Sequence, residues 1–325
     1  MSIKRLLPVL AMVASLALVV AACGSDNASS SGNGGGSSNA SADLSGTIRI
    51  DGSSTVFPFA EAAGELFNEE NPNVKITVGE SGTGGGFEKF CAGETDISDA
   101  SRPIKPDEEA PVCDKAGIKY EEIQIANDGI AVVTNPNLKV DCLTVAQLKK
   151  IWAPKSKIKS LKEVDPSLPD TKLALFGPGT DSGTFDFFTG AINGKEGASR
   201  EDYQASEDDN QLVTGVAGSD GGLGYFGFSY YESNQDKLNL VGVGESADKC
   251  VKPSSQAIQD GSYAPLSRPL FMYPSDKALA RPEVKAFMKF VVDNYKAIAE
   301  ASKIVPMTDT QAADSKSKVD SLAGT

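Results

Sequence analysis

Two glycine-rich segments that also carry hydroxyl side chains are the part of this chain best suited to bind an anion. They are Gly79–Gly86, with the sequence GESGTGGG, and Gly177–Thr184, with the sequence GPGTDSGT. Each follows a strand-like run and precedes a helix-like run. At a helix N-terminus the first backbone N–H groups lack partners, and the positive end of the helix dipole attracts negative charge. Serine and threonine also cap helices, and for either segment alone capping is the favoured interpretation.

Strand-like and helix-like segments alternate along the chain, which predicts an α/β fold with parallel sheets covered on both faces. The expected strands are 47–51, 74–78, 120–126, 130–134, 173–176, 223–228, 238–243 and 269–272. The expected helices are 58–70, 145–152, 184–192, 210–217 and 282–301. The polar tail after Met307 is expected to be partly disordered.

Four turns rich in hydrogen-bond donors follow the expected strands or the short segment at 96–98. Their sequences are GSST at 52–55, SGT at 81–83, DASRP at 99–103 and DSGT at 181–184. In open parallel sheets, ligands bind beyond the carboxyl ends of the strands, where such turns collect. Four turns at one such place are hard to explain as independent helix caps, so they predict a ligand site.

The N-terminus has the layout of a secretory signal at 1–22. Lys4 and Arg5 precede an apolar stretch that ends in small residues before Cys23. The sequence around Cys23 resembles the bacterial lipobox, which implies a lipidated cysteine and an extracytoplasmic protein anchored to the cell membrane. The alternatives are secretion without a lipid or a short membrane anchor, although the apolar stretch is short for a spanning helix. Residues 23–43 are rich in Ser, Gly and Asn and are expected to form a flexible tether.

The net charge of the chain limits the kinds of partner it can bind. A formal net charge of -13 argues against nucleic acid and against a basic membrane-binding face. An anion would therefore be attracted locally, by oriented N–H groups and one or two arginines.

The other four cysteines, Cys91, Cys113, Cys142 and Cys250, form an even set in an exported protein, which indicates disulfides and leaves three pairings open. No metal-binding cysteine spacing is present, and neither a metal nor a cofactor is expected.

Five motifs carry a resemblance to a known family. In order they are DGSST at 51–55, ESGTGGGF at 80–87, TDISDASRPI at 95–104, NDGIAVV at 127–133 and FGPGTDSGTFD at 176–186. Together they resemble the extracytoplasmic phosphate-binding proteins of the Pst ABC importer, over nearly the whole mature chain. The resemblance implies a two-lobed, type II periplasmic-binding-protein fold, with a mixed, mainly parallel sheet in each lobe and the ligand cleft between the lobes.

The resemblance also implies where the lobes begin and end. The chain would cross between them near 128–130 and again near 267–270. Lobe I would comprise 44–128 plus 269–325, and lobe II would comprise 129–268. Pairing Cys91 with Cys113 and Cys142 with Cys250 then keeps each disulfide inside one lobe, so this pairing is expected.

Inorganic phosphate is the ligand that the resemblance implies, and near neutral pH it offers many acceptor lone pairs and at least one proton. The residues assigned to phosphate are Ser54, Thr55, Ser81, Gly82, Thr83, Ser101, Arg102, Asp181, Ser182, Gly183 and Thr184. Arg102 would supply charge-assisted hydrogen bonds. Many family members carry an arginine where this chain has Pro178, so Arg102 would be the only cation of the site unless Arg200, Arg268 or Lys252 compensates.

A carboxylate at the site can accept the proton of phosphate but would repel fully ionised sulfate, which makes it a means of selectivity. The candidates are Asp99, Asp128 and Asp186, with Asp181 as a further one. The sequence does not rank them.

The resemblance implies high-affinity phosphate binding by hinge closure, and delivery to the permease and ATPase subunits of the importer. A receptor for sulfate or thiosulfate is the alternative within the binding class. Among enzymes, the absence of histidine excludes a Ser-His-Asp triad, a Cys-His pair and a histidine zinc site. The segment 179–183 is not a G-x-S-x-G elbow, and 82–86 lacks the ending of a P-loop, so no catalytic residue is expected. A metal-dependent phosphatase and a structural surface lipoprotein are the other hypotheses.

Overall fold

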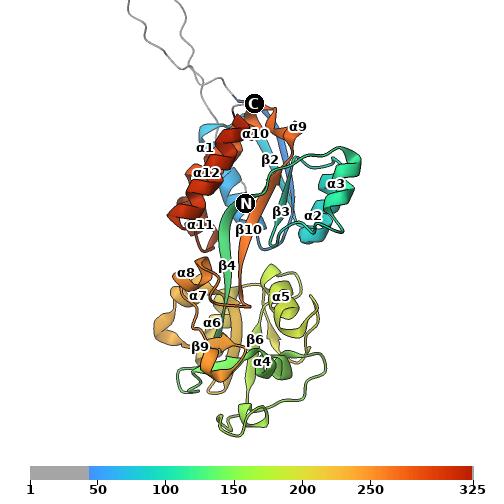
Figure 1. Ribbon diagram of the computed structural model, residues 1–325. Helices are drawn as coiled ribbons and strands as arrows, with labels where there is room; N and C mark the ends of the chain where they lie inside the picture. Colours follow the sequence, from blue (N-terminus) through green and yellow to red (C-terminus); the bar gives the residue numbers. More distant parts are fainter. Residues whose placement is uncertain (1–43, 324–325) are drawn as a thin grey trace, which may run out of the picture. The chain divides into compact units, whose positions relative to one another are not determined.

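The computed structural model describes residues 44–323 (Figure 1). The expected signal peptide 1–22, the lipidation of Cys23 and the tether 23–43 lie outside the described residues. Within the described part, no helix is long and apolar enough to cross a membrane.

The first strands form a parallel group that fixes where the helices begin. Strand β1 (Gly46–Gly52) pairs in parallel with β2 (Val74–Gly79) on one side and with β3 (Ile97–Ala100) on the other. Helix α1 (Phe57–Glu70) follows β1, and α2 (Gly82–Cys91) follows β2. Helix α1 buries Phe59, Ala63 and Phe67 at helical spacing, which holds it against the sheet. The N-termini of both helices therefore lie at the carboxyl edge of the strands, as predicted.

Two long antiparallel strands link the halves of the sheet. Strands β4 (Ile123–Thr134) and β10 (Ser267–Pro274) pair with each other and run side by side through the middle of Figure 1. The strand order is β2-β1-β3-β10-β4-β8-β6-β7, with β9 also pairing with β4. The prediction of separate strands at 120–126 and 130–134 was wrong, because residues 127–129 stay extended in register with 267–269 of β10. Asn-Asp-Gly resembles a turn in sequence, but a partner strand holds it straight.

The second half of the sheet combines parallel and antiparallel pairs. Its strands are β5 (Cys142–Thr144), β6 (Ala174–Gly177), β7 (Gln204–Ala205), β8 (Gly222–Gly227) and β9 (Asn239–Gly244). Its helices are α4 (Val145–Trp152), α5 (Gly183–Phe188), α6 (Asp209–Gly218), α7 (Phe228–Glu232) and α8 (Ser255–Gln259). Short 3-10 helices occur at Leu161–Glu163, Gln235–Lys237 and Ala247–Lys249. Helix α5 is shorter than predicted, because a π-helical turn at Thr189–Asn193 replaces its last part.

The C-terminal region is more ordered than the sequence indicates. It contains α9 (Asp276–Leu279), α10 (Pro282–Asp293) and α11 (Tyr295–Ser302), while α3 (Ala110–Ala116) belongs to the first half of the chain. The single helix predicted at 282–301 is two helices that meet at Asn294. The tail expected to be disordered forms α12 (Asp309–Ala323) instead. The buried side chains of Ala312 and Val319, and a 2.7 Å hydrogen bond from the Ser315 hydroxyl to the carbonyl of Gln124, hold this helix in place.

The described core has two main hydrophobic clusters. One gathers β1, α1 and α10 around Phe59 and Phe287, and the other gathers α4, α5 and β8 around Trp152 and Tyr225. A smaller cluster surrounds Phe87 and includes the first of two disulfides.

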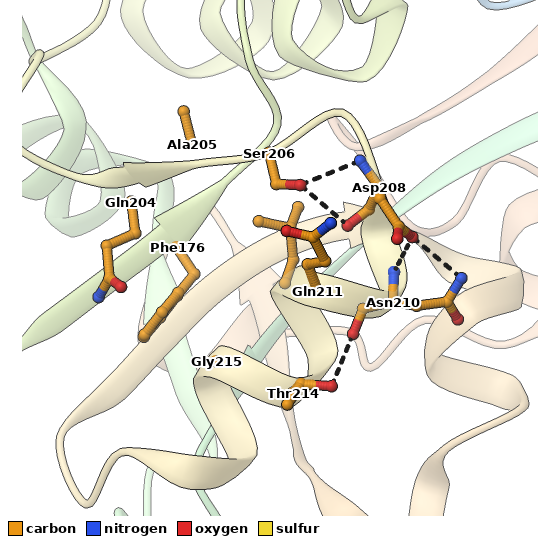
Figure 2. A pocket seen from close by; sticks show the side chains of 10 residues that line it. Phe176, Gln204, Ala205, Ser206, Asp208, Asn210, Gln211, Thr214 and Gly215 are labelled. Atoms are coloured by element: carbon orange, nitrogen blue, oxygen red, sulfur yellow. Dashed lines mark hydrogen bonds between the residues drawn. The ribbon is translucent and has the colours of Figure 1, made fainter.

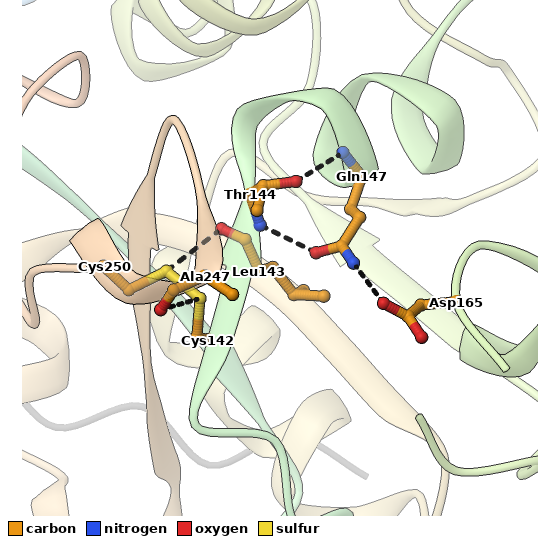
Figure 3. The surroundings of a disulfide bond; sticks show 7 residues. All are labelled: Cys142, Leu143, Thr144, Gln147, Asp165, Ala247 and Cys250. Carbon is orange, nitrogen blue, oxygen red and sulfur yellow. Dashed lines mark hydrogen bonds between the residues drawn. A yellow bond between two sulfur atoms is a disulfide. The ribbon is translucent and has the colours of Figure 1, made fainter. Parts of the chain in front are cut away.

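The disulfides join Cys91 to Cys113 and Cys142 to Cys250, which are the pairs expected from the lobe boundaries. The second of them ties the start of β5 to the segment that follows β9 (Figure 3). Each disulfide thus holds together elements that pack near one of the clusters.

Candidate anion-binding site

A cavity of about 340 Å³ lies where the turns after β1, β2 and β3 meet α5 and β10. Hydroxyl groups, glycine backbone and two arginines dominate its wall. The lining residues are Ser53, Ser54, Thr55, Ser81, Gly82, Thr83, Gly84, Gly85, Ser101, Arg102, Gly183, Asp186, Glu196 and Arg268. Most of the predicted phosphate residues are therefore brought together at one place.

The turn after β1 is held tightly against β3. The backbone nitrogen of Ser53 donates to the carbonyl of Asp99 at 3.0 Å. Gly52 has a φ of +154°, and a Cβ there would lie 2.1 Å from the carbonyl oxygen of Asp99. Only glycine fits this approach, and as a result Ser54 and Thr55 project beyond the end of β3.

Ser81 lines the cavity, but its donors are used elsewhere. Its hydroxyl donates to the carboxylate of Asp51, and its backbone nitrogen donates to the same oxygen at 3.1 Å. Lys89 donates to the other carboxylate oxygen at 2.6 Å. Burial raises the pKa of Asp51, but the hydrogen bonds from Lys89 and Ser81 outweigh burial and lower it. Because its hydroxyl hydrogen goes to Asp51, Ser81 presents an oxygen lone pair to the cavity.

Thr83 and Ser101 join the first turn of α2 to the end of β3. Their hydroxyl oxygens lie 3.1 Å apart, and the backbone nitrogen of Ser101 donates to the Thr83 hydroxyl oxygen at 3.2 Å. Because Thr83 already accepts this bond, its hydroxyl hydrogen is free to point at Ser101 or into the cavity.

Arg102 is clamped by a partner that the sequence did not indicate. Its Nη1 and Nη2 donate to the two carboxylate oxygens of Glu109 at 2.8 and 2.6 Å. This pairing raises the pKa of Arg102 further, so the guanidinium is always charged. Nη1 also donates to the carbonyl of Pro103, at 3.1 Å. Nε and the second hydrogen of Nη2 have no acceptor among residues 44–323, and both are available to an anion.

Arg268 is a second cation at the cavity, so Arg102 is not alone. Its Nε donates to Asp128 at 3.2 Å, Nη1 to the hydroxyl of Ser101 at 3.0 Å and Nη2 to the hydroxyl of Thr55 at 2.7 Å. Its Cζ lies 3.8 Å from the centre of the Phe187 ring, and only 14% of its side chain is exposed. The motifs gave no direct signal for Arg268, apart from its place beside the expected second crossing.

The other basic candidates lie elsewhere. Arg200 is buried, and it donates to the carbonyl of Ile151 at 2.9 Å and to Asp202 at 2.7 Å. Lys252 pairs with Asp141 at 3.6 Å. Neither lines the cavity.

The three carboxyl candidates have different surroundings. Asp128 is paired with Arg268. Asp186 lines the cavity, and its pKa is raised by burial and by Glu196, against the opposing effect of Arg268. Asp99 is fully buried, and neither of its carboxyl oxygens has a hydrogen-bond partner within the described region. Burial, with a contribution from Asp51, raises the pKa of Asp99 well above its usual value.

The residues of the second motif are divided between two cavities. Asp181, Ser182 and Thr184 line a neighbouring cavity of about 400 Å³, which shares Ser54, Thr55 and Gly183 with the first. The hydroxyl oxygen of Ser182 accepts from the backbone nitrogen of Thr184 at 3.2 Å, so Ser182 caps α5. The capping interpretation thus holds for Ser182, and Gly183 is the residue of this motif that faces both cavities.

Another cavity, of about 510 Å³, lies between β7 and α6 (Figure 2). Its polar side chains bond mainly to their own segment, as Asn210 does to Asp208 at 3.1 Å. None of the predicted anion-binding residues lines it. The hydroxyl turns therefore single out the first cavity as the candidate site.

Comparison with known proteins shows the family to which the chain belongs. The family model described as a PBP superfamily domain matches residues 37–294. The phosphate-binding protein PstS of Staphylococcus saprophyticus is 40% identical over 94% of this chain and 92% of its own length. The chain belongs to the PstS family. Another similar protein is SphX of Synechococcus elongatus, at 46% identity over 80% of this chain and 77% of its own length.

A solved structure resembles this member of the PstS family over most of its length. It is that of a possible phosphate binding protein from Planctomyces limnophilus, with a TM-score of 0.81 and 46% sequence identity. The match covers 86% of this chain and 99% of that one. The expected family and its two-lobed α/β fold of the type II periplasmic-binding-protein kind are thereby confirmed.

Proposed function

We propose that this protein binds inorganic phosphate in the 340 Å³ cavity, outside the cytoplasmic membrane, and delivers it to an ABC importer. The observation that carries the proposal is the convergence of three hydroxyl-bearing turns and two arginines on one cavity, in a member of the PstS family. The importer's permease and ATPase subunits are the expected partners, because the relatives' family serves such an importer.

The ligand contacts follow from which donors are free. Thr83, Ser101 and Arg102 donate from one side together with Ser54 and Thr55, and the backbone of Gly82 adds the N-terminus of α2. Asp181, Ser182, Gly183 and Thr184 contribute the N-terminus of α5, with Ser182 as its cap rather than as a direct donor. Ser81 contributes an acceptor, because its hydroxyl hydrogen is given to Asp51.

Asp128 is occupied by Arg268, and Asp181 lines only the neighbouring cavity, which leaves Asp99 and Asp186 as candidate acceptors of the ligand proton. Asp186 lines the cavity, whereas Asp99 is a buried carboxyl without a partner at the end of β3. Asp99 does not line the cavity, and its raised pKa favours the protonated form, so Asp186 is the better placed acceptor. Titrating the Asp99→Asn and Asp186→Asn variants with phosphate and with sulfate distinguishes them, because loss of the acceptor lowers the preference for phosphate.

Binding proceeds by closure of two lobes, which we assign to 44–128 plus 269–325 and to 129–268. The close approach of Gly183 to Ser54 and Thr55 across this boundary supports the assignment of the described arrangement as closed. The protein acts as a binding protein rather than as an enzyme, and its lipid at Cys23 keeps it at the membrane. Release of product from a chromogenic phosphate ester would contradict the first of these statements, and mass spectrometry of the mature N-terminus tests the second.

Isothermal titration of the purified, anion-stripped protein with phosphate tests the main proposal, with sulfate as competitor. We expect saturable one-to-one binding that excess sulfate does not displace. Binding of sulfate but not of phosphate would support the site and refute phosphate as its ligand. No response to either anion would refute an oxyanion receptor.

A further inference from the structure

Arg268 has contacts that a simple counter-charge does not require. It donates to two hydroxyl oxygens of the cavity wall, those of Thr55 and Ser101. We propose that Arg268 is a positioning residue that makes the Thr55 hydroxyl an obligatory donor toward the bound anion. This inference rests on the proposed function, because it concerns the same site.

The direction of the hydroxyl groups follows from the chemistry of the guanidinium. Arginine has five N–H donors and no acceptor, so a hydroxyl oxygen bonded to it must be the acceptor. Thr55 receives such a bond at 2.7 Å and Ser101 at 3.0 Å. The hydrogen of each hydroxyl must then point away from Arg268. The hydroxyl of Ser101 lies 3.1 Å from that of Thr83, which gives its hydrogen an acceptor within the protein. For Thr55, no other acceptor is bonded within the described chain, which leaves the cavity as its target.

The guanidinium is itself held in a fixed orientation. Asp128 receives its Nε at 3.2 Å, and the Phe187 ring lies against its face, 3.8 Å from Cζ. Both partners are largely fixed by the fold, because Asp128 is on β4 and Phe187 is on α5. The fork of Arg268 is therefore oriented by protein groups rather than by the ligand, which lowers the entropy lost on binding.

Arg268 also bonds across the proposed lobe boundary. Its Nη2 reaches the carbonyl of Gly183 in α5 at 3.5 Å, while the same nitrogen holds Thr55. Separation of α5 from the turn after β1 would break one of these contacts. The Thr55 hydroxyl is thus oriented by Arg268 only when the site is closed, which couples the orientation of this donor to closure.

A thermodynamic cycle tests the proposal against the simpler role of a positive charge. Phosphate affinity is measured for wild type, Arg268→Gln, Thr55→Val and the double variant. We expect Arg268→Gln to lose on the order of 10- to 100-fold in affinity. The double variant should lose clearly less than the product of the single losses, because without Arg268 the Thr55 hydroxyl is no longer aimed at the anion. Arg268→Lys should also bind phosphate weakly, since an ammonium cannot hold Asp128 and two hydroxyls together.

Two controls separate positioning from general damage. Arg200→Gln removes another buried arginine, so it should lower thermal stability and leave the anion affinity unchanged. Arg268→Gln leaves Asp128 buried without its partner, so the cycle is repeated in the Asp128→Asn background if the variant unfolds. Full affinity in Arg268→Lys, or multiplicative losses in the cycle, would overturn the proposal.

If the proposed phosphate-binding function is wrong, the wild-type protein itself fails to bind phosphate, which differs from the result expected if only the role of Arg268 is wrong. The wild-type protein is first titrated with phosphate, arsenate and sulfate. A wild type that binds only sulfate overturns the phosphate assignment, and the cycle is then run with sulfate and still tests Arg268. A wild type that binds none of the three overturns both proposals.

Discussion

Replacing Gly183 by alanine tests whether the closed arrangement is the one that binds the anion. A Cβ at this position would lie 2.3 Å from the hydroxyl oxygen of Thr55, 2.5 Å from its backbone nitrogen and 2.6 Å from the hydroxyl oxygen of Ser54. Side chains can rotate away, but the backbone nitrogen of Thr55, in the turn between β1 and α1, cannot. Helix α5 and the turn after β1 must therefore move apart in the variant whenever the site closes.

The size of the effect follows from these distances. Restoring a contact of roughly 3.5 Å to the Thr55 nitrogen requires a separation of about 1 Å. The 2.7 Å bond between Arg268 and Thr55 would then be stretched beyond hydrogen-bonding distance if Arg268 stays with α5. Overpacking of this kind costs about 1–3 kcal/mol, which corresponds to a phosphate affinity about 5- to 150-fold weaker.

Calorimetric titration with phosphate measures this loss, and fluorescence of Trp152 reports on α5 independently. Trp152 is the only tryptophan of the chain, and its ring centre lies 5.8 Å from that of Phe188 at the end of α5. Gly218→Ala is the matched control, because a Cβ at the end of α6 meets nothing within 4 Å. Its phosphate affinity should equal that of wild type. Wild-type affinity in Gly183→Ala, with an unchanged fluorescence response to phosphate, would refute the reasoning.

Three other predictions address the charges and the caps. Arg102→Ala should weaken phosphate binding by about 1–3 kcal/mol, because Arg102 lines the cavity and two of its N–H groups have no acceptor among residues 44–323. Unchanged affinity by calorimetry would remove Arg102 from the site. Burial raises the pKa of Asp209 to about 7 in the folded protein, from 3.8. The folded state then binds more protons than the unfolded state between these values, so stability falls as pH rises from about 4 to about 7. Asp209→Asn should therefore be more stable than wild type at pH 8, by roughly 2–4 kcal/mol in urea unfolding, and equally stable near pH 4; a less stable variant at pH 8 would contradict this. Ser182→Ala removes the cap of α5, so it should cost about 0.5–2 kcal/mol in stability and weaken phosphate binding. Ser182→Asn should restore both the stability and the binding. Failure of asparagine to restore binding would indicate direct contact of the serine with the ligand.

Sequence alone determined the local elements around the site and the class of the fold. The strand and helix periods predicted β1, β2, α1 and α4 to within one or two residues. The turns after β1, β2 and β3 were predicted to converge, because parallel strands place their carboxyl ends on one edge. This is why the sequence places Thr55, Thr83 and Ser101 at one site.

Only the tertiary structure decided which of the predicted groups are free to bind a ligand. The hydroxyl of Ser81 is taken by Asp51, which lies 30 residues away, and Arg102 is clamped by Glu109. Arg268 reaches Thr55 across 213 residues of sequence. Helix α12 and the unbroken strand β4 likewise depend on partners distant in the chain. The spacing of apolar residues predicts whether a segment forms a helix or a strand and which of its faces is buried. The partner of a side-chain hydrogen bond depends on which distant segment folding brings close. The local sequence carries no signal for that partner.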